Sequence, residues 1–116
     1  MEPDSTPLRI WVYVDASGRV PFSEWKGGLA PDEQALIERR IERLEVGNWG
    51  DWRPVGDGVA ELRIHHGPGY RIYVGRQGLQ AVLLLGGGDK STQAKDIRIA
   101  QAHWADHRTR SRETRG

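Results

Sequence analysis

Three short apolar segments follow one another closely at 59–66, 70–75 and 79–85, and glycine-containing turns separate them. In the first two segments apolar and polar residues alternate, which is typical of half-buried strands. The third is apolar at nearly every position, which predicts a central strand covered on both faces. Because connections this short join neighbouring antiparallel strands, the sequence predicts an antiparallel meander over this region.

The rest of the chain predicts one further strand and three helices. Residues 8–14 are rich in β-branched and aromatic residues and predict a strand, and 22–29 predict a short helix. Residues 31–46 carry an apolar stripe at helical spacing between a proline and a glycine, which predicts a longer helix. The segment 92–107 predicts a final helix. The expected fold is therefore α+β, in the order β-α-α-β-β-β-α.

Length and charge indicate one domain with a basic end. The 116 residues suit a single domain, which we assign to 1–107. The net charge of +1 is uneven, because 108–116 carries +3 and the remainder −2. We expect this basic tail to be disordered.

Several classes of protein are excluded by residue content. The chain has no cysteine, so disulfides and thiolate metal sites are excluded, and a reducing cytoplasm is the expected location. The longest apolar run, 81–85, is far shorter than the roughly 20 residues of a membrane span. An acidic start without an apolar run argues against a signal peptide. His103 and His107 lack the glutamate of a zinc-binding helix motif, so no metal is expected.

One face of the expected meander gathers side chains suited to an RNA phosphate. Successive strand residues point to opposite faces, so the polar residues of 59–66 and 70–75 should project together. A lysine follows the third strand, after three glycines. These candidate residues are Glu61, Arg63, His65, Arg71, Tyr73 and Lys90.

These residue types fit metal-free RNA cleavage. Attack by a 2′-OH builds negative charge on the phosphate, which fixed guanidinium and ammonium groups stabilise. A histidine can move the protons, and a tyrosine can stack on an unpaired base. The alternative interpretation is a solvated strand face with ordinary cross-strand Glu–Arg pairs.

A family resemblance rests on motifs in a fixed order. They are Gly-Val-Ala-Glu-Leu-Arg-Ile at 58–64, Gly-Tyr-Arg-Ile-Tyr at 69–73 and Leu-Leu-Gly-Gly-Gly-Asp-Lys at 84–90, followed by Gln93 and Asp96. Together they resemble the "addiction module killer protein" group, a HigB-like branch of the RelE/ParE superfamily of toxins. The resemblance extends from about Leu8 to about Ala105.

The resemblance implies a fold, a partner and an activity. The fold would be a twisted antiparallel sheet with an N-terminal helical hairpin and a C-terminal helix. The chain would be the toxin of a type II toxin–antitoxin system, neutralised by a helix-turn-helix antitoxin. It would cleave mRNA on the ribosome without a cofactor. By position, Arg63, Arg71 and Lys90 would carry the chemistry, with His65 or Tyr73 assisting.

The chain also departs from this pattern. Several RNA-cleaving relatives place a tyrosine or histidine in the C-terminal segment, whereas no tyrosine follows Lys90 here. His103 and His107 lie on an expected helix away from the sheet, so we rank them below His65. Two alternatives therefore remain open: a ParE-like inhibitor that binds DNA gyrase, and an inactive relative that only binds its antitoxin.

Overall fold

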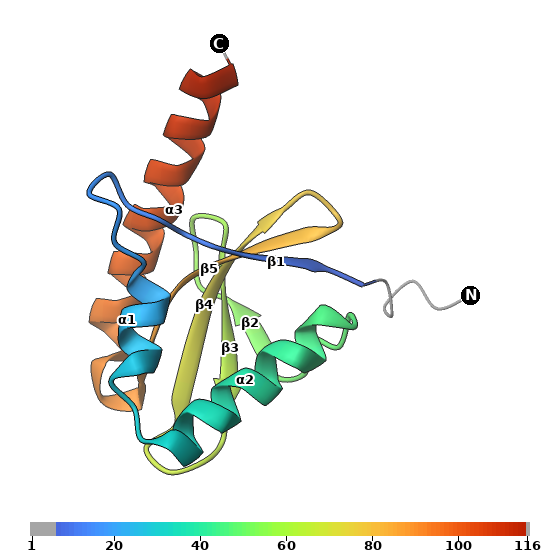
Figure 1. Cartoon of the computed structure of the whole chain (residues 1–116), viewed down its shortest axis with the longest axis vertical. Coiled ribbons are helices and arrows are strands. Elements are labelled where there is room, and N and C mark those ends of the chain that lie inside the picture. The colour runs from blue at the N-terminus through green and yellow to red at the C-terminus, as the bar shows by residue number, and fades with distance from the viewer. Residues whose placement is uncertain (1–6, 116) are drawn as a thin grey trace.

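The computed structural model describes residues 7–115, with side chains as far as 112. It has an α+β fold built on one five-stranded sheet (Figure 1). The elements in order are β1 (Arg9–Val12), α1 (Pro21–Gly27), α2 (Pro31–Glu45), β2 (Trp52–Pro54), β3 (Val59–Ile64), β4 (Tyr70–Gln77), β5 (Ala81–Asp89), the 3₁₀ turn η2 (Lys90–Thr92) and α3 (Gln93–Arg115).

The meander expected from the sequence forms the middle of the sheet. Strands β3, β4 and β5 pair antiparallel, in the sheet order β1-β5-β4-β3-β2. Strand β5 lies between β1 and β4, and its residues Val82–Leu85 are buried. The apolar run therefore marks a strand covered on both faces, as predicted.

Two features of the sheet differ from the prediction. Strand β1 pairs with β5 in parallel, so the sheet is mixed and the expectation of an all-antiparallel sheet is wrong. A short edge strand, β2, pairs with β3 inside the segment 48–58, which the sequence indicated as irregular. Proline is tolerated in β2 because an edge strand has one side without a strand partner.

The two faces of the sheet carry separate apolar clusters. One face packs against α1 and α2 through residues that include Phe22, Ile37 and Leu62. The opposite face packs against α3 through residues that include Tyr73 and Trp104. The sheet is thus the middle of three layers, and both faces are partly covered by helix.

The last helix is longer than the sequence indicated. It runs from Gln93 to Arg115, whereas we expected an end near His107, and Figure 1 shows its C-terminal end projecting beyond the sheet. Of the range 108–116, expected to be a disordered tail, residues 108–115 are helical, and Gly116 lies outside the described residues. Arg110 ties this part to the body, because its Nη2 donates to the carbonyl of Val14 at 2.5 Å and its side chain pairs with Asp106.

Candidate functional site

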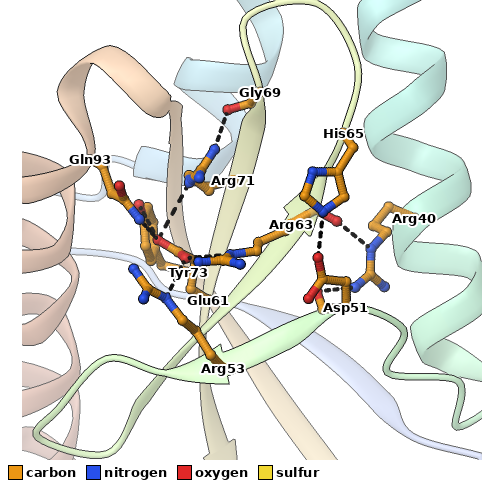
Figure 2. Close-up of polar contacts among 10 residues, drawn as sticks. All are labelled: Arg40, Asp51, Arg53, Glu61, Arg63, His65, Gly69, Arg71, Tyr73 and Gln93. Atoms are coloured by element: carbon orange, nitrogen blue, oxygen red, sulfur yellow. Dashed lines mark hydrogen bonds and ion pairs between the residues drawn. The ribbon is translucent and has the colours of Figure 1, made fainter.

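A buried glutamate lies at the centre of the expected polar face. Glu61 on β3 has no exposed surface, and its carboxylate is surrounded by cationic and polar side chains (Figure 2). We call this group the Glu61 cluster. It consists of Glu61, Arg53, Arg63, Arg71, Tyr73 and Gln93.

The strand register explains why these side chains meet. Glu61 lies directly opposite Tyr73, Arg63 opposite Arg71, and Arg53 of β2 opposite Glu61. Residues opposite each other in antiparallel strands share a face, so all five project toward the α3 side of the sheet. The shared face predicted for Glu61, Arg63, Arg71 and Tyr73 is confirmed.

Three guanidinium groups contact the single carboxylate through their Nε atoms. The distances from Nε to the nearest Glu61 oxygen are 3.1 Å for Arg53, 3.3 Å for Arg63 and 3.7 Å for Arg71. Their side chains are 47%, 28% and 10% exposed, in that order. The cluster is therefore a cationic surface with a net charge of +2, arranged around a buried anion.

Neutral donors complete the coordination of Glu61. The Tyr73 hydroxyl donates to Oε2 at 3.1 Å, and Gln93 Nε2 donates to the same oxygen at 2.8 Å. Burial raises the pKa of Glu61, but hydrogen bonds from Gln93, Arg53, Tyr73 and Arg63 together outweigh it and leave the pKa below its usual value. Glu61 is therefore an ionised organising group at neutral pH.

Tyr73 has a different position from the one the sequence indicated. The residue is fully buried, and burial together with the nearby Glu61 carboxylate raises its pKa well above the usual value. In this structure its ring is closed off from a stacking base and its hydroxyl is committed to Glu61. Tyr73 thus positions Glu61. Because its side chain is buried, it cannot reach a ligand in the assisting catalytic role expected for it.

Arg71 and Lys90 flank the turn between β3 and β4. Arg71 Nη1 donates to the Gly69 carbonyl at 2.8 Å. A Cβ placed on Gly69 would lie 3.0 Å from Arg71 Nη1 and 3.6 Å from the Cβ of Lys90, so both residues adjoin this glycine. Lys90 is exposed at the start of η2. The structure thus brings these two predicted residues together, with Arg71 the deeper one.

His65 lies beyond the end of β3 and pairs with a carboxylate. Its Nε2 makes a short hydrogen bond with Asp51, and 72% of its side chain is exposed. The bond to His65 is the largest cause that lowers the pKa of Asp51. When Nε2 carries the proton toward Asp51, Nδ1 remains as a proton acceptor. Asp51 therefore orients an accessible imidazole.

Arg40 of α2 fixes the backbone that carries this pair. Its Nη2 donates to the carbonyls of Trp49 at 2.6 Å and Asp51 at 3.0 Å, and its Nε donates to the Arg63 carbonyl at 3.3 Å. Figure 2 shows Arg40 reaching toward Asp51 and His65. The side chain of Arg63 lies between this group and Glu61. The two groups of side chains are thus held on one framework.

Sequence reasoning did not identify Arg53, Gln93, Asp51 and Arg40 as site residues. Arg53 belongs to β2, which was not expected as a strand, and Arg40 looked like an ordinary polar position of an amphipathic helix. Gln93 lies within the motif order behind the family resemblance, which was the available signal for it. The histidines of α3 lie elsewhere: His103 stacks on Tyr13, and His107 bonds to Gln77.

Among the residues that the structure describes, no group of three or more His, Cys, Asp or Glu side chains is placed to hold a metal ion. None of the described helices is long and apolar enough to cross a membrane.

The fold and site together define an α+β protein with a mixed sheet and a carboxylate-centred arginine cluster. No model of a known protein family matches the chain. A Haemophilus influenzae protein described as "Uncharacterized protein" is 54% identical over 68 residues, which cover 59% of this chain and 69% of that protein. The chain belongs to the same family as this Haemophilus influenzae protein.

Proposed function

We propose that this protein is the toxin of a type II toxin–antitoxin pair and that it cleaves mRNA on the ribosome without a metal. The observation that carries the proposal is the convergence of Arg53, Arg63 and Arg71 from three strands on one buried carboxylate. Such an array is suited to a phosphate because guanidinium groups bind phosphate oxygens in paired hydrogen bonds. The RelE/ParE resemblance supplies the toxin class.

In this proposal Glu61 orients the arginines and does not react. It engages Arg53 and Arg63 through Nε, and the exposed fractions of 47% and 28% leave their outer nitrogens accessible. Those nitrogens hold the scissile phosphate and stabilise the charge that builds on it. Because Glu61 already holds the guanidinium groups of Arg53 and Arg63 through their Nε atoms, little reorganisation is needed when the phosphate binds.

His65 acts as the base of the reaction. The 2′-OH of the nucleotide attacks phosphorus, forming the O2′–P bond, and its proton passes to Nδ1 of His65. The P–O5′ bond breaks, and the departing oxygen takes a proton from water. The products are a 2′,3′-cyclic phosphate and a 5′-hydroxyl. Asp51 acts through His65, as a positioning residue that stabilises the imidazolium.

Arg71 and Lys90 contribute in different ways. Arg71 is 10% exposed and lies behind the other two arginines, so it holds Glu61 and adds positive potential to the site. Lys90 is exposed beside it and adds a mobile ammonium group near the phosphate. A helix-turn-helix antitoxin would neutralise the toxin, and the ribosome would place its action in the cytoplasm.

A second candidate function is a ParE-like inhibitor of DNA gyrase that acts by binding. Two observations favour it: Tyr73 is buried, and Glu61 is held in ion pairs. Among the described residues of the candidate site, His65 is therefore the one side chain that we propose as a base. A surface of this kind can bind an acidic partner without chemistry. An inactive relative that binds only an antitoxin would use the same surface.

The proposal is tested by inducible expression of the chain alone, with mapping of transcript 5′ ends. We expect the wild-type chain to arrest growth and to generate new 5′ ends within mRNA. Arg63→Ala and His65→Gln should each reduce cleavage by about 100-fold, since each removes one contribution to the transition state. Arg98→Ala on the exposed surface of α3 is the matched control and should stay toxic.

Two outcomes would contradict the nuclease proposal. Growth arrest with intact transcripts and inhibited DNA supercoiling would establish the gyrase function instead. Cleavage that persists in Arg63→Ala and His65→Gln would place the chemistry elsewhere. Circular dichroism of each variant shows whether a loss of activity reflects unfolding.

A further inference from the structure

A second cationic feature lies between α2 and the end of β3. It is a groove of about 380 Å³, which is within the size range of small-ligand sites. Its polar lining consists of Arg39, Arg40, Arg43, Asp51, Arg63 and His65. Leu36 and Ile64 add apolar surface. We call it the α2–β3 groove.

The charge of the groove is not balanced by the protein. Arg40 is 5% exposed, it forms no ion pair among the described residues, and its Nη1 has no hydrogen-bond partner. Burial is the main cause that lowers the pKa of this guanidinium. Arg39 and Arg43 are exposed and, within residues 7–112, form no ion pair either.

Nearby acidic side chains offset little of this charge. Glu38 and Glu42 lie on the same helix but do not line the groove, and Glu38 already pairs with Lys26. Asp51, the one carboxylate of the lining, binds His65 and also attracts Arg40 and Arg63, so it offsets one positive charge of the groove. Three guanidinium groups of the lining form no ion pair among the described residues and face one carboxylate. This excess of positive charge favours an anion that enters the groove.

We propose that the α2–β3 groove binds one nucleotide unit of single-stranded RNA, next to the nucleotide held at the Glu61 cluster. The phosphate is held by Arg39 and Arg43, and the base lies on Leu36 and Ile64. Guanidinium groups and apolar side chains together match the two parts of a nucleotide.

The position of Arg63 favours RNA over an acidic peptide. Its side chain lines the groove, and its Nε contacts Glu61 at 3.3 Å, so the cations of the groove and of the Glu61 cluster form one path that meets at Arg63. Figure 2 shows Arg63 between His65 and Glu61. RNA supplies one negative charge at every nucleotide along such a path, whereas a peptide would need acidic residues at matched spacing. This inference rests on the proposed function and extends it to a second contact with the substrate.

The test measures the binding of a short single-stranded RNA whose 2′-OH groups are methylated, so that it cannot be cleaved. Fluorescence anisotropy is recorded with the full chain over a series of salt concentrations. For Arg39→Gln/Arg43→Gln we expect Kd to rise by at least about tenfold and the salt slope to fall by about 0.7, which corresponds to one phosphate that is no longer neutralised. Arg9→Gln/Arg98→Gln removes the same charge from exposed positions outside the groove and should change both quantities little.

The control separates a groove contact from general loss of charge. Equal effects of the two double variants, or no effect of Arg39→Gln/Arg43→Gln, would overturn the inference. Unchanged RNA binding together with weaker binding of a poly-glutamate peptide would overturn it in favour of an acidic peptide. All four positions are exposed, so we expect both double variants to fold. Thermal unfolding of each variant checks this.

The inference and the proposed function fail in different ways. If the groove variant binds RNA normally while cleavage still requires Arg63 and His65, the inference alone is wrong. If the groove binds RNA but no transcript is ever cut, the nuclease proposal alone is wrong.

Discussion

Glu61 is the residue on which the candidate site depends. A carboxylate with no exposed surface is costly to bury unless it is paired and hydrogen-bonded. Here Arg53, Arg63 and Arg71 supply the positive charge, and Tyr73 and Gln93 supply further donors. The carboxylate in turn keeps three like charges close together on one small surface.

Removing the charge of Glu61 should therefore destabilise the fold in a pH-dependent way. At pH 7 we expect Glu61→Gln to lower the free energy of unfolding by about 3 kcal/mol, because it leaves Arg71 buried without a counter-ion. The folded-state pKa of Glu61 is depressed, so its contribution to stability is present above the unfolded pKa. That contribution is lost as pH falls through the folded pKa.

Chemical denaturation at a series of pH values measures this difference. The gap in stability between the wild-type chain and Glu61→Gln should narrow as the pH falls below the usual range of a glutamate. Glu42→Gln, at an exposed position of α2 outside the cluster, removes the same charge and is the control. A gap that does not vary with pH would contradict the account of Glu61 as an ionised organising group.

At the residue scale the sequence predicted which side chains share a face but not how deeply they are buried. The period of two in β3 and β4 placed Glu61, Arg63, Arg71 and Tyr73 together. Their burial depends on α3, which covers this face through Gln93 and Trp104, and on Arg53 from the next strand. Such coverage involves residues distant in sequence, so a local pattern does not contain it.

At the scale of elements, glycines in two central strands allow helices to pack closely on the sheet. A Cβ on Gly75 of β4 would lie 2.2 Å from the Trp104 ring, and one on Gly87 of β5 would lie 2.3 Å from the Trp25 ring. A Cβ on Gly88 would lie 1.9 Å from Asp96. The glycine run at 86–88, which the sequence placed after the third strand, is thus part of β5, and Gly87 and Gly88 within it make close contacts.

Gly75→Ala tests whether the close packing of α3 on the sheet depends on this glycine. The added methyl group collides with a tryptophan held between α3 and the sheet, so we expect a loss of about 3 kcal/mol, at the upper end of the usual cost of overpacking. Gly27→Ala at the end of α1 is the control, since a Cβ there meets nothing within 4 Å. Thermal melts of both variants test this, and equal melting temperatures would show that Trp104 can move aside.

The elements that were predicted correctly are those with local signals. Alternation predicted β3 and β4, and the apolar stripe between Pro31 and Gly47 predicted α2. The parallel pairing of β1 with β5 depends on segments far apart in the chain. Strand β2 has three residues and includes Pro54, so no strand pattern is visible. Helix α3 continues past His107 because no proline or glycine interrupts 108–115.

At the scale of the whole molecule, the proposed RNA path crosses from one part of the fold to another. The Glu61 cluster lies on the α3 side of the sheet, whereas the α2–β3 groove is lined by α2 from the opposite layer. Arg63 belongs to both, and Arg40 fixes the intervening backbone. Cationic side chains from both layers therefore meet at one side of the sheet, beside β2 and β3.

We propose that the Glu61 cluster and His65 together cleave RNA. The most direct test of this proposal is end-group analysis of mRNA incubated with purified ribosomes and the purified chain. We predict 2′,3′-cyclic phosphate and 5′-hydroxyl ends, with the yield falling by about 100-fold in Arg63→Ala. Unbroken mRNA with a folded wild-type chain on the ribosome, or undiminished cleavage by Arg63→Ala, would contradict the claim.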